Sequence, residues 1–156
     1  MVRGSFLTEL VMSHRKQKSS DRVPQPPKRG VGTAPSQRRA RGQEGEDIAA
    51  AFVQRLEGWE ILARNVYFRA GELDIIATSG DELVFIEVRS RWTTRGPRAE
   101  DSITRTKQRR LTIAAQLWLQ AHPRWRRHRA RFDVIAVDLR TAQVSAHHRS
   151  AFSAAY

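Results

Sequence analysis

Residues 71–91 read GELDIIATSGDELVFIEVRSR, and this stretch decides the fold. Two apolar runs, 73–77 and 83–88, flank a short polar segment whose Gly-Asp pair is typical of a type II′ turn. The sequence therefore predicts a β-hairpin, with Leu73 and Ile75 on the same face of its first strand. Apolar residues occupy both faces of the two strands, which is typical of strands covered on both sides.

Charged residues gather at the open end of this hairpin. A turn closed by Ser79 and Glu82 would pair Asp74 with Glu87, whose side chains would have Cβ atoms about 4.5–5.5 Å apart. Two carboxylates at that distance repel by about 3 kcal/mol at an effective dielectric constant near 20. A divalent metal ion bound by both would explain the arrangement. In the alternative interpretation, a cross-strand ion pair joins Glu72 to Arg89, and the other two acids face solvent.

Composition and charge narrow the class of protein. The chain of 156 residues suits one domain, and the lack of cysteine excludes disulfide scaffolding and cysteine zinc sites. No apolar run approaches the roughly 18 residues that span a membrane, so we expect a cytoplasmic protein without a membrane partner. The net charge of +12 is uneven, because residues 89–131 hold thirteen Lys/Arg and two acids. This basic segment favours nucleic acid as the partner, although charge alone also fits a ribosomal or membrane surface.

Three segments differ in composition. Residues 1–41 are rich in basic residues, proline and serine, so we expect a disordered basic tail. Residues 42–147 should form the folded domain, and residues 148–156 a C-terminal tail. Within the domain, apolar periodicity predicts a helix that ends at Gly58 and has Glu44, Glu46 and Asp47 in its first turn.

The remaining pattern predicts an α/β fold. We expect strands at 59–67, 72–78 and 82–89, a loop at 90–98, a helix at 99–121, a basic loop at 124–131, a buried strand at 132–139 and an edge strand at 143–147. The strand after the long helix should run parallel to the third strand. The result is a mixed sheet in the order α-β-β-β-α-β, with helices on both faces.

Histidines and tryptophans are further candidates. His122, His147 and His148 lack acidic companions at ligand spacing, so we interpret them as surface residues. Trp118 falls on the apolar stripe of the long helix and belongs to the core, whereas Trp92 and Trp125 lie on basic loops where they could stack on bases.

Six short motifs occur together in a characteristic order. They are GEDIA (45–49), ILARN (61–65), GELDIIA (71–77), LVFIEVRSR (83–91), Lys107 with Arg110-Leu111, and RFDVIAV (131–137). In this combination the chain resembles the YraN-type family of uncharacterised bacterial proteins, which implies a restriction-endonuclease-like fold. More distantly it is similar to archaeal Holliday-junction resolvases and to the PD-(D/E)xK nucleases.

The resemblance implies a metal-dependent endonuclease that acts on or binds DNA, including branched DNA, with Mg²⁺ or Mn²⁺ as cofactor. By position, Asp74 and Glu87 would bind the metal and Glu46 would be the catalytic helix glutamate. Mg²⁺ prefers carboxylate oxygens and water, and a bound metal ion makes water a better nucleophile. Here Arg89 stands where the nuclease pattern has a lysine. Arginine stabilises negative charge but stays protonated, so it cannot act as a base.

The basic residues expected to contact nucleic acid are Arg91, Arg95, Lys107 and Arg110. Residues 42–156 contain seventeen arginines and a single lysine, Lys107, which could contact phosphate or partly replace the motif lysine. Two alternatives to the nuclease stay open: a catalytically weak nucleic-acid-binding protein with the same fold, and an RNA- or ribosome-associated basic protein. By analogy with the resolvases, the chain could form a homodimer.

Overall fold

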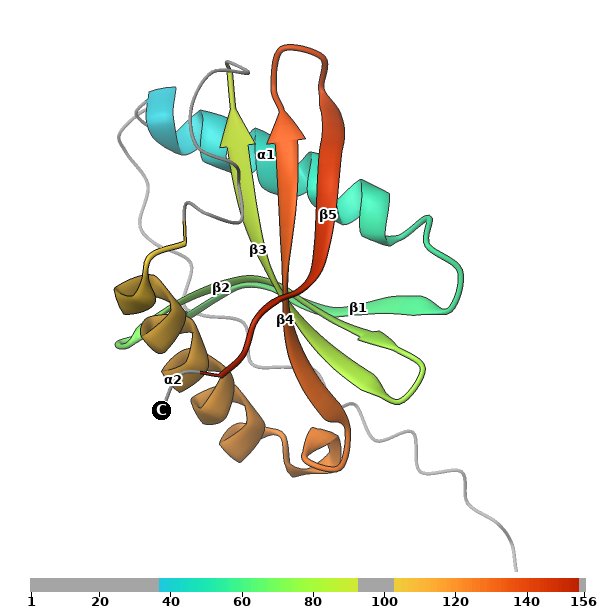
Figure 1. Cartoon of the computed structure of the whole chain (residues 1–156), viewed down its shortest axis with the longest axis vertical. Helices are drawn as coiled ribbons and strands as arrows, with labels where there is room; N and C mark the ends of the chain where they lie inside the picture. Colours follow the sequence, from blue (N-terminus) through green and yellow to red (C-terminus); the bar gives the residue numbers. More distant parts are fainter. Residues whose placement is uncertain (1–36, 93–102, 155–156) are drawn as a thin grey trace, which may run out of the picture.

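Five strands form one mixed sheet with a helix on each face (Figure 1). The computed structural model describes residues 37–92 and 103–154. Its elements are α1 (Gln37–Val53), β1 (Trp59–Phe68), β2 (Gly71–Ser79), β3 (Glu82–Arg91), α2 (Arg105–Ala121), the 3₁₀ helix η2 (Pro123–Trp125), β4 (Arg129–Asp138) and β5 (Gln143–Phe152). The strands are hydrogen-bonded in the order β1-β2-β3-β4-β5, and only the β3–β4 pair among them is parallel. The predicted α/β class, the element order and the parallel crossover are confirmed.

The central hairpin has the predicted register. Ser79 pairs with Glu82 across the turn, and the ladder continues to the pair formed by Ile75 and Ile86. Gly80 has a φ of +59°, a conformation that glycine adopts without steric cost. The two-residue turn therefore sets which side chains of β2 and β3 lie opposite one another.

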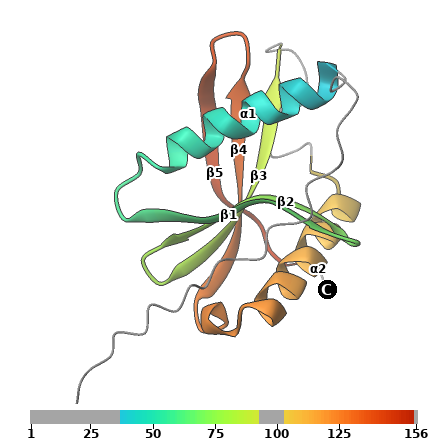
Figure 2. The same ribbon diagram turned by 180° about the vertical axis from the view of Figure 1, so that it is seen from behind.

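The two helices cover separate hydrophobic cores on the two faces of the sheet (Figures 1 and 2). On one face, Ala49 and Val53 of α1 pack against Ile75, Ile86 and their neighbours. On the other, Trp118 and other residues of α2 pack with Leu73, Ile76 and Phe85 among others. The expectation that Leu73 shares a face with Ile75 is wrong. The β2–β3 ladder ends at Ile75, and beyond this point Leu73 packs in the core under α2, whereas Ile75 packs in the core under α1.

Helix α1 begins earlier than expected. It starts at Gln37, inside the segment 1–41 that we expected to be disordered; residues 1–36 lie outside the described part of the chain. Arginine, alanine and glutamine in the first turns are good helix formers. Glu44, Glu46 and Asp47 consequently lie in the middle of the helix and not in its first turn.

Helix α1 also ends before the predicted boundary. Its last residue is Val53, and the backbone N–H groups of Arg55 and Leu56 donate to carbonyls three residues earlier. Such bonds tighten the end of a helix into a turn. Gly58, with a φ of +73°, then leads into β1 and does not end the helix directly.

Three other boundaries differ from the prediction. Helix α2 starts at Arg105 and not at residue 99, because the Thr104 side chain caps it by accepting a hydrogen bond from Lys107 N–H. Residues 93–102, most of the expected loop and the first predicted helical residues, lie outside the described part. The expected basic loop 124–131 instead contains the end of η2 and the start of β4.

Strand β5 takes up most of the predicted C-terminal tail. It runs to Phe152, which pairs with Phe132 on β4, and the two rings stack with centroids 4.7 Å apart. This apolar contact stabilises residues 148–152 as part of the edge strand of the sheet. Among the described residues, no helix is long and apolar enough to cross a membrane.

Candidate active site

Two buried carboxylates form the centre of the candidate site. Asp74 of β2 is 8% exposed and Glu87 of β3 is 5% exposed. They follow the last pair of the β2–β3 ladder, and there the Asp74 Oδ2 accepts a hydrogen bond of 2.8 Å from the Val88 backbone N–H. The side chain thus replaces a strand partner for that N–H group. The alternative in which both acids face solvent is wrong.

The two carboxylates influence each other electrostatically. Burial raises the pKa of Asp74 well above its usual range, and the nearby Glu87 charge raises it further. Burial also raises the pKa of Glu87, against the opposing effect of Lys107 and Arg89. Ionising both acids is therefore unfavourable without additional positive charge.

Lys107 of α2 supplies one such charge. Its Nζ lies 3.1 Å from Glu87 Oε2, while the Arg89 guanidinium lies 3.7 Å from Glu87 Oε1. Lys107 lies in the first turn of α2, which follows its cap residue Thr104. Sequence reasoning named Lys107 as a nucleic-acid contact, and the structure brings it directly to the acidic pair.

Glu46 and Glu72 extend the acidic cluster outward. Glu46 is half-buried on α1, and its pKa is raised by burial and by the nearby Glu72, although the Asn65 side-chain amide donates a hydrogen bond to it. Glu72 also raises the pKa of Glu87. Four acids from α1, β2 and β3 thus lie within electrostatic reach of one another.

Glu72 has a partner that the sequence analysis missed. The Tyr67 hydroxyl donates a hydrogen bond to the Glu72 carboxylate, which raises the pKa of Tyr67 to about 12. The two residues are paired across β1 and β2, whereas the expected pairing of Glu72 with Arg89 lies beyond the observed β2–β3 ladder. Tyr67 is 54% exposed, so its ring lies on the surface beside the acids. The pairing of Tyr67 with Glu72 follows from the β1–β2 register, which the sequence analysis did not predict.

Close packing of α1 on the sheet positions Glu46. A Cβ atom added to Gly45 would lie 2.5 Å from the Ser90 Cβ, so only glycine allows the helix to approach β3 this closely. One residue after Glu46, Asp47 forms an ion pair with Arg64 of β1. The GEDIA segment therefore combines a close contact, an acid directed to the site and a link to the sheet.

The other predicted nucleic-acid contacts are distributed around this site. Arg110 lines a pocket beside Glu72 and Lys107, and Arg91 ends β3. Arg95 lies outside the described residues. Trp92 is 50% exposed, with the Arg41 guanidinium 5.4 Å from its ring centroid.

The structure confirms the predicted position of one tryptophan and revises that of another. Trp118 is buried in the core as predicted, and His122 stacks on its ring with a centroid separation of 4.2 Å. Trp125 is partly buried against the α2-side core, so it does not stand freely on a loop. Among the predicted histidine and tryptophan assignments, those that change are mainly those of side chains that contact another helix or strand.

The expectation that His147 is a surface residue is wrong. Its Nε2 lies 2.9 Å from Oδ2 of Asp133, a fully buried acid on β4. Asp133 also accepts hydrogen bonds from Arg131 Nε at 3.0 Å and from the Ser150 N–H at 2.9 Å. Burial opposes ionisation of Asp133, but these hydrogen bonds prevail and lower its pKa. The cluster joins β4 to β5 at an irregularity in their pairing.

Among residues 37–92 and 103–154, no three His, Asp or Glu side chains are grouped closely enough to hold a metal ion by themselves. The donor chemistry of the acidic pair nevertheless fits Mg²⁺, which takes carboxylate oxygens from one or two residues and keeps several water ligands. Asp74 and Glu87 are the residues that could hold it.

Comparison with known proteins gives a consistent family match. Residues 45–137 match the sequence profile described as uncharacterised protein family UPF0102. A UPF0102 protein of Stutzerimonas stutzeri is 45% identical over 95 residues, which are 60% of this chain and 79% of the relative. One from Pseudomonas aeruginosa (strain LESB58) is 40% identical over 105 residues, 67% of this chain and 83% of the relative. One from Halorhodospira halophila is 45% identical over 100 residues, which are 64% of this chain and 78% of the relative. The profile spans Glu46, Asp74, Glu87 and Lys107.

Proposed function

Because the chain belongs to the uncharacterised protein family UPF0102, as its resemblance to the YraN-type family predicted, we propose a function from its site: metal-dependent hydrolysis of phosphodiester bonds in DNA. One observation carries the proposal. Two buried carboxylates, Asp74 and Glu87, lie at the end of one hairpin, and the Lys107 ammonium is 3.1 Å from Glu87. Buried acids with perturbed pKa values beside a cation are typical of catalytic sites.

Asp74 and Glu87 are the residues that would hold Mg²⁺ or Mn²⁺. Their burial and mutual repulsion favour a divalent cation between them, because it would allow both to ionise. When bound, the ion would lower the pKa of a coordinated water molecule and neutralise charge on the phosphate. The two strands hold the carboxylates in place before any substrate binds, through the Val88 N–H and the hairpin register.

The neighbouring side chains would act on the phosphate and the attacking water. Lys107 and Arg89 both lie within 4 Å of Glu87, so their positive charges would stabilise the negative charge that develops on the phosphate. Glu46 has a raised pKa and would orient the water and accept its proton. Lys107, supplied by α2, would take the role that the nuclease pattern gives to the lysine at position 89.

A cleavage assay tests the proposal. Labelled single-stranded, duplex and four-way-junction DNA would be incubated with the full chain and Mg²⁺ or Mn²⁺, with EDTA as the metal-free control. We expect Asp74→Asn to slow cleavage by at least about a hundredfold while DNA binding persists. Asp81→Asn is the matched control, because Asp81 is an exposed acid in the turn of the same hairpin. Equal cleavage by the two variants would refute the assignment.

Variants of the two cations test their roles. We expect Lys107→Met to abolish cleavage and Arg89→Lys to change it little. If the wild type is inactive and Arg89→Lys is active, the lysine missing from position 89 limits catalysis and Lys107 does not replace it.

Arg89 also favours a second candidate function, a nucleic-acid-binding protein that retains the fold without catalysis. It stands at the motif lysine and cannot act as a base. This candidate predicts DNA binding that weakens steeply with salt and needs no metal, and cleavage by neither wild type nor Arg89→Lys. Competition between DNA and RNA of equal length would show whether RNA is the preferred partner.

A further inference from the structure

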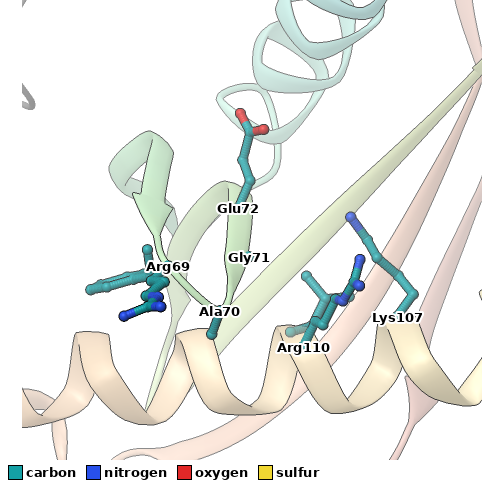
Figure 3. A pocket seen from close by; sticks show the side chains of 8 residues that line it. Arg69, Ala70, Gly71, Glu72, Lys107 and Arg110 are labelled. Atoms are coloured by element: carbon teal, nitrogen blue, oxygen red, sulfur yellow. The ribbon is translucent and has the colours of Figure 1, made fainter.

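A second feature, a pocket of about 450 Å³, lies beside the acidic site between the β1–β2 turn and α2 (Figure 3). The side chains and backbone that line it include Arg69, Ala70, Gly71, Glu72, Lys107 and Arg110. Its size is within the range of pockets that hold small ligands, about 300–1,000 Å³.

The pocket is built by a close contact between the turn and the helix. A Cβ atom added to Gly71 would lie 3.4 Å from the Arg110 Cβ, so the turn backbone lies directly against α2. This contact brings Arg69 from the strand side and Arg110 from the helix side to one cavity. The walls therefore come from two elements that the packing holds together.

The charged residues that line the pocket are predominantly cationic. The pocket contains Arg69, Lys107 and Arg110 against a single acid, Glu72. In Figure 3 the Glu72 side chain points away from α2, whereas Lys107 and Arg110 extend from α2 toward the strands. Within the described residues, no carboxylate forms an ion pair with Arg69 or Arg110. Both arginines are exposed, and in Figure 3 their guanidinium groups lie on either side of the turn.

Lys107 belongs to both the pocket and the acidic site. It lines the pocket, and its Nζ contacts Glu87 at 3.1 Å. An anion in the pocket would therefore lie next to a phosphate held at Asp74 and Glu87. Guanidinium groups bind phosphate through paired hydrogen bonds, which makes phosphate the anion that suits this lining best.

We propose that the pocket formed by Arg69, Lys107 and Arg110 binds a phosphate group of the nucleic-acid strand, adjacent to the phosphate at the acidic site. This inference rests on the proposed function for its choice of ligand. The phosphate has two possible sources. It is either an internal diester with one negative charge or a terminal monoester with up to two.

Binding measurements without metal test the pocket separately from catalysis. Fluorescence anisotropy in EDTA would use the full chain and three single-stranded DNAs of one sequence, with a 5′-phosphate, a 3′-phosphate or neither. We expect Arg69→Ala and Arg110→Ala each to weaken binding about tenfold and to reduce its salt dependence. The control is Arg109→Ala, which removes the same charge from an exposed neighbour on α2 outside the pocket.

The pattern of losses identifies the source of the phosphate. Equal losses with all three DNAs support an internal diester, and a loss confined to one phosphorylated DNA supports the corresponding strand end. If the two pocket variants bind like Arg109→Ala while the wild type binds well, the pocket inference is refuted and the proposed function is untouched. If the wild type binds none of the DNAs and no RNA of the same sequence, both fail. Thermal melts of all three variants would confirm that they are folded.

Discussion

Among the residues that the structure describes, two aspartates are buried, and their surroundings have opposite electrostatic character. Asp74 accepts one backbone hydrogen bond and lies near the negative Glu87, and its pKa is raised by burial and by that charge. Asp133 receives hydrogen bonds from several donors, and its pKa is lowered despite burial. For the metal-free protein we therefore expect Asp74→Asn to increase the free energy of unfolding and Asp133→Asn to decrease it.

The size of the first effect follows from Coulomb repulsion. Asp74 and Glu87 directly follow the last pair of the β2–β3 ladder. At about 5 Å, the separation typical of opposed side chains on antiparallel strands, two carboxylates repel by about 3 kcal/mol at a dielectric constant near 20. Lys107 already offsets part of this repulsion at Glu87. Asparagine keeps an oxygen that can accept the Val88 N–H. We expect a net gain of about 1–2 kcal/mol and a Tm higher by about 3–6 °C.

The second effect is larger and has the opposite sign. Removing the Asp133 charge leaves the Arg131 side chain without one of its carboxylate partners and weakens the hydrogen bonds from His147 and Ser150. Breaking a buried charge pair costs about 3–5 kcal/mol. We expect a Tm lower by about 10 °C or more.

The pH dependence separates the two cases. The folded-state pKa of Asp74 is raised above its ordinary value of 3.8. Below that pH the carboxyl group is protonated and does not destabilise the protein; as pH rises through the folded-state pKa, the buried charge destabilises it. The folded-state pKa of Asp133 is lowered, so its contribution is present above 3.8 and is lost only as pH falls through the lower folded-state pKa. The gain from Asp74→Asn should disappear near pH 4, whereas the loss from Asp133→Asn should persist there.

Thermal melts by circular dichroism in EDTA, at several pH values between 4 and 8, would measure both differences. Matched wild-type melts at each pH provide the reference. If Asp74→Asn destabilises the protein at pH 7 as much as Asp133→Asn does, the Asp74 carboxylate is not repelled by Glu87. The physical reason for a cation at this pair would then be refuted.

Three further outcomes follow from the same structure. Gly45→Ala should lower the free energy of unfolding by about 1–3 kcal/mol because its Cβ would meet Ser90, and adding Ser90→Gly should restore the Tm; no rescue would contradict the packing argument. Tyr67 should titrate at about pH 12 by ultraviolet absorbance, and Glu72→Gln should lower that pKa; an unchanged titration would show that Glu72 is not the cause. Millimolar Mg²⁺ should raise the Tm of the wild type but not of Asp74→Asn, and equal shifts would count against metal binding at this pair.

The parts of the site that were predictable depend on local geometry. Gly80 and its neighbour specify a tight turn, and the turn fixes the register that brings Asp74 and Glu87 to the same end of the hairpin. Alternation along a strand then carries that information outward for several residues. The limit was reached beyond Ile75, because the ladder ends there, before the predicted pairs of Asp74 with Glu87 and of Glu72 with Arg89, and Leu73 packs in the other core.

The parts that were not predictable depend on contacts between distant elements. The pairing of His147 with Asp133 requires the register of β4 and β5, which an irregularity near Asp133 shifts. Apolar periodicity gives no information on such a shift, and the predicted end of the strand at residue 147 hid the role of Phe152. Similarly, the contact of Lys107 with Glu87 depends on how α2 packs on the sheet, which no local pattern specifies.

The arginine at position 89 is easier to understand once α2 is in place. Arg89 and Lys107 approach different oxygens of the same Glu87 carboxylate, at 3.7 Å and 3.1 Å. A guanidinium is a planar group that can form paired hydrogen bonds, whereas an ammonium is a compact point charge. Lys107 is the one lysine among the eighteen Lys/Arg residues of 42–156, and it lies beside the buried Glu87. In the proposed site, Arg89 would hold positive charge at the end of the strand, and Lys107 would bring a second positive charge from the helix to the other oxygen of Glu87.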